Sequence, residues 1–264
     1  MEDTKDEMIL GDHDMKYKMT HKKRGYAIVI NNQVFQPQTD KEERRGTKQD
    51  AEGIKNRFEA LGFVVEPYEN LTCSQMLRTM GEVGRRNHSK NDCLALVVMS
   101  HGDEGIVYGT DGIVELDILL APLKGDKCPT LAGKPKLIFI QACRGTKLDG
   151  GVEVADEAGL DELDGRNHVH KIPAEADFLI AYSVVPGFFS WRNPTNGSWF
   201  MQALIQVLGD YGQQLDILSL MTIVNRKVAY EFESNAASKA MSKKKQVPCI
   251  TSMLTKLVYF WPKQ

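Results

Sequence analysis

Two residues that can do nucleophilic chemistry stand at the ends of apolar runs. Residues 93–100, CLALVVMS, are followed by His101, and residues 136–143, KLIFIQAC, end in Cys143. A cysteine thiolate is an effective nucleophile, and an imidazole beside it can activate the sulfur or protonate a leaving group. Because ligands collect at the carboxyl ends of strands in an open α/β sheet, we expect both side chains to face one crevice.

A glycine follows each member of this pair closely, Gly102 after His101 and Gly145 after Cys143. Glycine leaves room for backbone N–H groups to approach a substrate, as an oxyanion hole requires. Taken singly, a cysteine at a strand end is more often a buried apolar side chain, and a histidine is more often a hydrogen-bonded surface residue. We interpret the remaining cysteines as such core or surface residues; they are Cys73, Cys93, Cys128 and Cys249.

The cysteine and histidine spacings argue against a metal or a disulfide framework. The five cysteines are widely spaced and form no C-x-x-C pair. His168 and His170 lie close together in the sequence, but no further cluster of ligands supports a metal there. We therefore expect no metal and no cofactor.

The composition is that of a globular protein rather than of a nucleic-acid-binding or membrane protein. Lys and Arg number 33 against 35 Asp and Glu, so no basic stripe suggests a nucleic-acid partner. No apolar run reaches the roughly 18 residues of a membrane span. The charged N-terminus lacks the apolar core of a secretory signal. We therefore expect a cytoplasmic protein with reduced cysteines.

Five apolar runs predict strands that are buried on both faces, as in a mostly parallel sheet covered by helices. They are residues 26–30, 62–68, 93–100, 136–143 and 177–185. A last run, 247–260, has Pro248 near its start and is expected at the end of the sheet, where a partner could pair with it.

Helical patterns fall between these runs and predict an α/β fold with helices on both faces of the sheet. They cover residues 48–61, 73–85, 198–210 and 216–233. Thr72 and Gln75 have the spacing of a capping box at the start of the second helix.

Two segments lack such patterns. Residues 1–24 mix charges without periodicity and are expected to form a short mobile arm. Residues 149–164 hold seven acidic residues and no basic ones. Such a run cannot bury enough apolar surface to stay ordered, so it is either a plain solvated linker or a functional loop beside a strand end.

Several motifs together resemble the caspase family of cysteine proteases. Gln141-Ala142-Cys143-Arg144-Gly145 fits the family's cysteine signature, and Ser100-His101-Gly102 fits its histidine signature. Further matches are Arg44-Arg45-Gly46-Thr47, Tyr182-Ser183, Ser190-Trp191-Arg192-Asn193, Gly197-Ser198-Trp199-Phe200 and Pro248-Cys249-Ile250. The resemblance covers about residues 17–260 and implies the three-layer caspase fold. The short arm is similar to that of effector caspases, which act in apoptosis.

The resemblance implies roles for the reactive pair. Cys143 would attack the scissile carbonyl, and His101 would protonate the leaving amine and later help activate water. The backbone N–H groups of Gly102 and Cys143 would hold the oxyanion. In the family a backbone carbonyl, here near residue 42, orients the histidine.

The resemblance also implies a substrate cleft that selects aspartate and prefers Asp-x-x-Asp sequences. Arg44, Gln141 and Arg192 match the aspartate pocket, and two guanidinium groups can clamp one carboxylate. The remaining candidate substrate-binding residues are Ser190 in the binding strand, Phe189, Trp191 and Met241 for the residue before the aspartate, and Asn193 and Trp199 for the residue four positions upstream. Loop 235–241 lacks the aromatic residues of some relatives, which affects contacts further upstream.

The acidic segment contains a sequence that such an enzyme would cut. Asp161-Glu162-Leu163-Asp164 is followed by Gly165, so we expect cleavage after Asp164, by this enzyme or by upstream initiator caspases. Asp149 is a second candidate, and cleavage after Asp14 would release a propeptide. The resulting parts are a large subunit within 25–148, a linker at 149–170 and a small subunit within 171–264, paired as a homodimer along the last strand.

Three other interpretations remain open on these residues. The chain could be a caspase-like scaffold without activity, which acts by binding. It could belong to another group of cysteine hydrolases, for example one that prefers arginine, although two pocket arginines oppose that. A redox-sensing thiol is the third.

Overall fold

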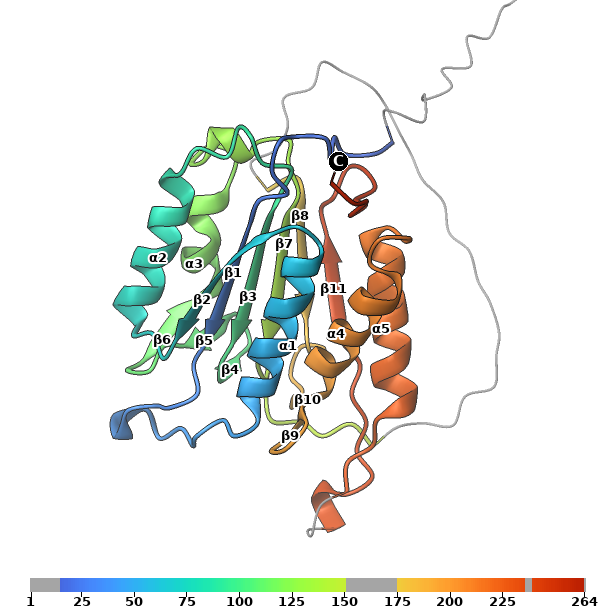
Figure 1. Cartoon of the computed structure of the whole chain (residues 1–264). Helices are drawn as coiled ribbons and strands as arrows, with labels where there is room; N and C mark the ends of the chain where they lie inside the picture. The colour runs from blue at the N-terminus through green and yellow to red at the C-terminus, as the bar shows by residue number, and fades with distance from the viewer. Residues whose placement is uncertain (1–14, 151–174, 236–238, 264) are drawn as a thin grey trace, which may run out of the picture.

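The computed structural model describes residues 15–150, 175–235 and 239–263, and its centre is a six-stranded sheet (Figure 1). The strand order is β11-β8-β7-β3-β1-β2, and every pair is parallel except β11 with β8. The strands are β1 (Tyr26–Asn31), β2 (Val64–Glu69), β3 (Leu94–Met99), β7 (Lys136–Gln141), β8 (Phe178–Tyr182) and β11 (Cys249–Ser252). The predicted α/β class with a mostly parallel sheet is confirmed.

Helices cover both faces of this sheet, as Figure 1 shows. One layer contains α1 (Thr47–Ala60), α4 (Trp199–Tyr211) and α5 (Ile217–Glu231), and the other contains α2 (Cys73–Arg85) and α3 (Leu116–Leu120). The sequence predicted four of these helices to within two residues at each end, and missed the short α3. The described short 3-10 turns are Pro37–Thr39, Ala121–Leu123, Pro129–Leu131 and Lys239–Met241.

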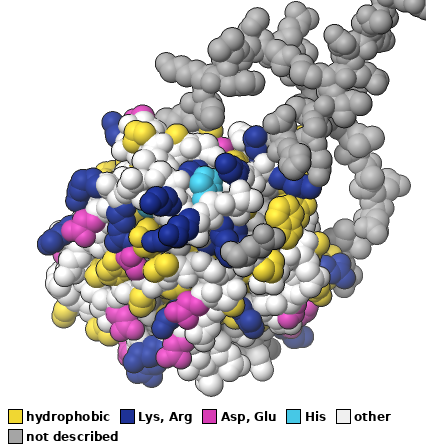
Figure 2. Space-filling model, turned by 45° about the horizontal axis from the view of Figure 1, so that its top comes forward, with side chains coloured by type: hydrophobic (Ala, Val, Ile, Leu, Met, Phe, Trp, Pro, Cys, Tyr) yellow, Lys and Arg dark blue, Asp and Glu magenta, His cyan; other side chains and the backbone are white. Residues whose placement is uncertain are grey.

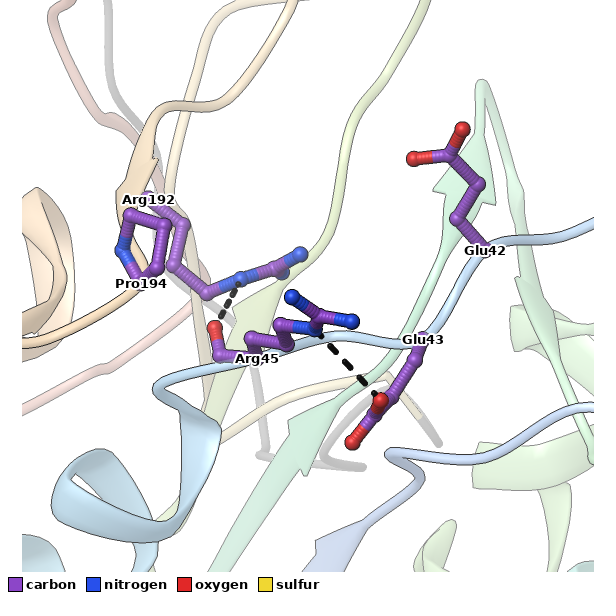
Figure 3. A pocket seen from close by; sticks show the side chains of 5 residues that line it. All are labelled: Glu42, Glu43, Arg45, Arg192 and Pro194. Carbon is purple, nitrogen blue, oxygen red and sulfur yellow. Dashed lines mark hydrogen bonds and ion pairs between the residues drawn. The ribbon is translucent and has the colours of Figure 1, made fainter.

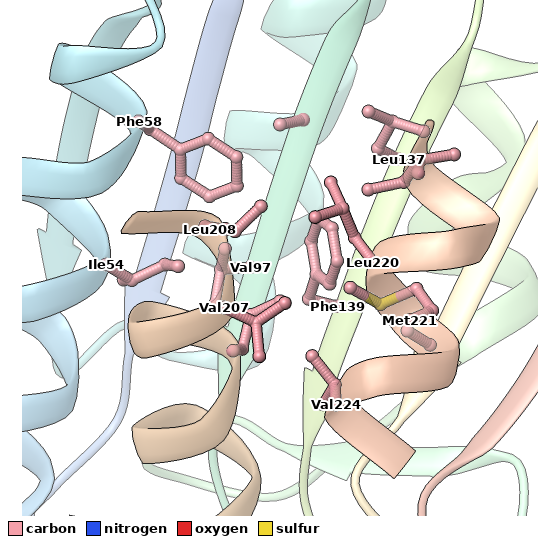
Figure 4. Packing of buried hydrophobic residues seen from close by; sticks show 14 of the residues in the cluster. Ile54, Phe58, Val97, Leu137, Phe139, Val207, Leu208, Leu220, Met221 and Val224 are labelled. Carbon is pink, nitrogen blue, oxygen red and sulfur yellow. The ribbon is translucent and has the colours of Figure 1, made fainter. Parts of the chain in front are cut away.

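The alternation of side chains along each strand divides the core into two clusters. On β3, Val97 points to the layer of α1, α4 and α5, while its neighbour Val98 points to the layer of α2 and α3. Figure 4 shows Phe58 of α1, Val207 of α4 and Leu220 of α5 meeting strand residues on the first side. Because both faces are covered, β3 and β7 are buried along their whole length, which explains why β3 and residues 137–140 of β7 are apolar throughout.

Local capping fixes where two helices begin. Thr72 Oγ1 accepts the backbone N–H of Gln75, and the Gln75 side chain accepts the N–H of Thr72, so the predicted capping box is present. Asp216 caps α5 by accepting the N–H groups of Leu218 and Ser219. Such caps satisfy backbone donors that have no partner within the helix.

The strands differ from the expectations in three respects. Residues 62–68 were predicted to be buried on both faces, but β2 is the sheet edge and Val64 is 50% exposed. The last strand covers only Cys249–Ser252 of the run 247–260. Small sheets made of β4 (Gly102–Asp103), β5 (Ile106–Tyr108) and β6 (Ile113–Glu115), and of β9 (Arg192–Asn193) and β10 (Gly197–Ser198), were not predicted.

Residues 15–24 pack on the domain, although the sequence suggested an arm as far as residue 24. The N–H of Tyr17 donates to Leu257 O at 2.9 Å, and the N–H of Leu257 donates to Met15 O at 2.8 Å. The Tyr17 side chain is buried. This pairing joins the beginning of the described chain to its end.

The surface carries charges of both signs. Figure 2 shows Lys, Arg, Asp and Glu side chains interspersed over the visible face, with hydrophobic side chains in separate groups. Within the described ranges, none of the helices has the length and apolar character needed to cross a membrane.

Candidate active site

A cavity of about 180 Å³ lies at the carboxyl ends of β3 and β7. Both residues of the predicted reactive pair, His101 and Cys143, line it. The other lining residues are Ser100, Gln141, Ala142, Phe189, Ser190, Trp191, Arg192 and Met241. The parallel pairing of β3 with β7 explains why residues 42 positions apart in the sequence meet there, since Met99 lies opposite Gln141 in the register.

Cys143 is half-buried, and its sulfur lies against one backbone segment. The N–H of Ser190 donates to the sulfur at 3.4 Å, and the thiol donates to Ser190 O at 3.9 Å. Burial raises the pKa of Cys143, while the Ser190 N–H and the charges of Arg192 and Arg44 oppose that rise. At neutral pH the resting sulfur is therefore a thiol.

His101 is held by the loop that precedes α1. Its Nε2 donates to Glu42 O at 2.8 Å, which is the carbonyl that the family resemblance implied. Burial lowers the pKa of His101 to about 4; the hydrogen bond to Glu42 opposes this, and the charges of Arg44, Arg192 and Lys41 add to it. A neutral imidazole that donates from Nε2 keeps a lone pair on Nδ1, so it can accept a proton.

Arg44 is fully buried beside this cavity. Its Nη1 donates to Asn32 O at 3.0 Å and to Thr47 Oγ1 at 3.1 Å. Its Nε and Nη2 have no hydrogen-bond partner among the described residues, and neither has Oε1 of Gln141, whose Nε2 donates to Ser190 Oγ at 2.9 Å. Buried donors without partners are costly in a folded protein, which indicates that they serve a ligand.

Arg192 lines the cavity that His101 and Cys143 share and also a second cavity of about 600 Å³ (Figure 3). Its Nε donates to Arg45 O at 3.0 Å, which ties β9 to the loop before α1. In the second cavity, which Pro194 and Glu42 also line, Arg45 Nε lies 3.6 Å from Glu43 Oε2. The Glu42 side chain points away from this pair in Figure 3.

Aromatic rings form the apolar wall of the cavity. Phe189 and Trp191 meet at 5.2 Å between ring centroids, and Trp191 stacks on Trp199 at 5.6 Å. Trp199 is buried, stacks on Trp191 and is not among the residues that line this cavity, so its contact with the residue four positions upstream stays a prediction. Asn193 lies outside the cavity at the exposed end of β9, where its Oδ1 accepts the N–H groups of Thr195 and Asn196.

Two glycines permit close backbone approaches near Cys143. A Cβ on Gly102 would lie 2.8 Å from the Ala142 Cβ and 3.1 Å from Cys143 O. Gly145 has a φ of 144°, and a Cβ there would lie 2.4 Å from the backbone of Gly187. Both positions therefore require glycine to bring the loops together.

Of the three expected cleavage positions, only Asp149 lies among the described residues. Asp149 is half-buried, and its carbonyl accepts the N–H of Lys245 at 3.0 Å. Asp14 and Asp164 lie outside the described residues, as do His168 and His170. Among the described residues all five cysteines are free, and no cluster of three or more His, Cys, Asp or Glu could hold a metal.

Sequence reasoning missed two residues near the site. Asp50 is buried on α1 and accepts the N–H of Ser198 through both oxygens at 3.1 and 3.0 Å. Burial raises its pKa to about 6, against the opposing effects of Ser198, Arg44 and Arg192. The sequence did contain a signal for Asp50: it is a charged residue four positions before Ile54, on the apolar face of the helix. The other is Phe35, which contacts His101 from a polar loop and gave no such signal.

Comparison with known proteins agrees with this geometry. The sequence matches the family described as Caspase domain over residues 24–259. The crystal structure of Caspase-1 from Spodoptera frugiperda is similar, with a TM-score of 0.87 at 45% identity, and the match covers 94% of this chain and 96% of that chain.

Similar sequences come from vertebrates and insects. Caspase-7 of Gallus gallus is 47% identical over 93% of this chain and 80% of its own length. Caspase-3 of Bos taurus is 47% identical over 92% of this chain and 87% of its own length. Caspase-1 of Drosophila melanogaster is 45% identical over 94% and 76%. The chain therefore belongs to the caspase family, and as an effector caspase of the caspase-3/7-like type it is a cysteine endopeptidase that cleaves proteins after aspartate in apoptosis.

Proposed function

We propose that Cys143 is the nucleophile and His101 the acid–base catalyst of this protease. The observation that carries the proposal is that the thiol, the imidazole and Arg192 line one cavity, with the unsatisfied nitrogens of Arg44 beside it. A neutral thiol next to a neutral imidazole can transfer its proton when the substrate binds, because the thiolate then has a carbonyl carbon to attack.

The reaction would proceed in two halves. The Cys143 proton moves to Nδ1 of His101, and the sulfur bonds to the scissile carbonyl carbon, whose oxygen becomes an anion near the backbone N–H groups of Gly102 and Cys143. The anion collapses, the C–N bond breaks, and the imidazolium gives its proton to the leaving amine. Water then attacks the thioester with His101 as base, which releases the acid and the thiol.

Aspartate selection would rest on Arg44, Gln141 and Arg192. A substrate carboxylate would accept from the unsatisfied nitrogens of Arg44 and from the guanidinium of Arg192. An asparagine would leave both cations without a counter-charge, at a cost of about 3–5 kcal/mol. Phe189, Trp191 and Met241 would receive the preceding residue. Asn193 and Trp199 would meet the residue four positions upstream, giving an Asp-x-x-Asp preference.

A pair of substrates and one variant test this assignment. The wild-type chain should cleave a tetrapeptide with aspartate at the cut, and should not cleave the matched arginine peptide. Cys143→Ala should abolish cleavage while leaving the thermal unfolding midpoint within a few degrees. Activity that survives in Cys143→Ala, or an equal rate on the arginine peptide, would refute the assignment.

We further propose that the chain is activated by cleavage in its acidic segment and works as a homodimer in the cytoplasm. Within the described part of the chain, β11 pairs on one side only, so its other edge can pair with a second copy. Sequencing the new N-termini after incubation tests the cut: we expect fragments that begin at Gly165 and Met15. Sedimentation should give twice the chain mass, and a monomer in the active state would contradict the dimer.

A further inference from the structure

Phe35 contacts the ring of His101. The two ring centroids are 4.8 Å apart, and the planes are tilted by 56°. Phe35 is half-buried and lies in the polar loop between β1 and α1, where an isolated aromatic residue has no core to join. Its contact with the histidine therefore accounts for its position.

The backbone around Phe35 is fixed on both sides. The N–H groups of Gln33 and Val34 both donate to Asn70 Oδ1, at 2.8 and 2.9 Å, and the N–H of Gln36 donates to Thr110 O at 2.8 Å. These three bonds attach the loop to segments that follow β2 and β5. A ring on such a braced backbone keeps its place without help from a ligand.

The same loop holds His101 at a second point, because Glu42 O accepts its Nε2. Between these two contacts, Lys41 lies over the ring of Tyr108 at 4.8 Å, which fixes the middle of the loop. A hydrogen bond at one nitrogen leaves the imidazole free to swing about that bond. A ring packed against it removes that freedom, so Nδ1 stays directed to one side.

We propose that Phe35 is a positioning residue for His101, which shields the imidazole from water and fixes the direction of its Nδ1. This inference rests on the proposed role of His101. It goes beyond that role because it assigns the ring's orientation and hydration to a residue that need not touch the substrate.

Several charged groups surround His101, so shielding from water affects the pKa of its imidazole. Lys41 and Arg44 face it from the loop that carries Phe35, Arg192 from β9, and the thiol of Cys143 from the end of β7. Burial is the first cause that lowers the pKa of His101, ahead of these cations. If Phe35 excludes water, its removal should raise that pKa towards the ordinary value and let the ring rotate.

The test uses Phe35→Ala with Phe35→Leu as the conservative variant. We expect Phe35→Ala to lower kcat about tenfold with little change in KM, since a misdirected Nδ1 affects the chemical step. The acidic limb of kcat/KM should move up by about one pH unit. Phe35→Leu, which keeps an apolar cover, should restore most of the pH profile. Val34→Ala, at an exposed neighbour in the same loop, is the matched control and should match the wild type.

A readout without turnover separates this inference from the proposed catalytic roles. In the Cys143→Ala background, NMR titration of labelled histidine, assigned by the signal lost in His101→Ala, gives the pKa directly. A higher His101 pKa in Phe35→Ala supports the inference even if His101 proves not to be catalytic. An unchanged pKa and acidic limb in Phe35→Ala, or in the polar variant Phe35→Gln should the alanine variant not fold, would overturn it.

Discussion

The hydroxyl of Tyr17 donates a 2.7 Å hydrogen bond to Oδ1 of Asp177, which lies 160 residues further along the chain. The N–H of Thr255 donates to the same hydroxyl oxygen at 2.9 Å, and Lys136 Nζ lies 3.9 Å from the other Asp177 oxygen. All four residues come from different parts of the sequence. If the acidic segment is cut as proposed, Tyr17 and Asp177 belong to different fragments, and their bond crosses the new interface.

Tyr17→Phe should therefore weaken the fold. The change leaves the N–H of Thr255 without its acceptor and removes one donor from a buried carboxylate, so the free energy of unfolding should fall by about 1–3 kcal/mol. Urea denaturation of the uncleaved Cys143→Ala chain measures this. Tyr211→Phe, at a well-exposed tyrosine, is the control. Equal stability of the two variants would show that the Tyr17 hydroxyl contributes nothing.

Asp50 should make the fold less stable as the pH rises. Its folded-state pKa of about 6 lies above the ordinary 3.8. A raised carboxyl pKa means that the folded protein binds the proton more tightly, so its stabilising effect is full below pH 3.8 and is lost as the pH rises through 6. The loss should approach about 3 kcal/mol. Asp50→Asn cannot titrate, so its unfolding free energy should lose less than that of the wild type between pH 4 and pH 7. An identical pH dependence in the two proteins would contradict the prediction.

Cys143 should react slowly with small alkylating agents at neutral pH. Because burial raises its pKa, the thiolate fraction is small at pH 7 and keeps growing above pH 9. The iodoacetamide rate, followed by peptide mapping at residue 143, should increase steadily over that range. Cys143→Ala supplies the background rate of the other four cysteines. A plateau reached below pH 7 would indicate a resting thiolate and contradict the prediction.

Arg44→Lys keeps the positive charge but should still strongly impair aspartate recognition. Lysine offers one ammonium where arginine has a planar fork, and it cannot hold the bonds to Asn32 and Thr47 while also reaching a carboxylate. We expect kcat/KM for an aspartyl peptide to fall about 10²- to 10³-fold. Lys48→Arg, on the exposed side of α1, is the control; a loss of less than threefold in Arg44→Lys would remove Arg44 from the pocket.

The sequence predicted those features that depend on local patterns. The α2 boundaries follow from the Thr72 capping box, and the meeting of His101 with Cys143 follows from two buried parallel strands. Burial of Trp199 behind Trp191 and exposure of Val64 depend instead on which elements become neighbours. No periodicity encodes that choice. The contact between Phe35 and His101 was not predicted for the same reason, because the sequence of a loop does not show which residues its side chains will contact.

Arg44 also affects how the thermal stability of the protein responds to small carboxylic acids. Two of its buried nitrogens have no partner among the described residues, and each such donor costs about 1–3 kcal/mol. A small carboxylic acid that satisfies them binds only the folded chain, so it raises the unfolding temperature in proportion to the logarithm of its concentration. Melting curves of the Cys143→Ala chain can therefore rank carboxylate compounds for this pocket without any peptide being cut.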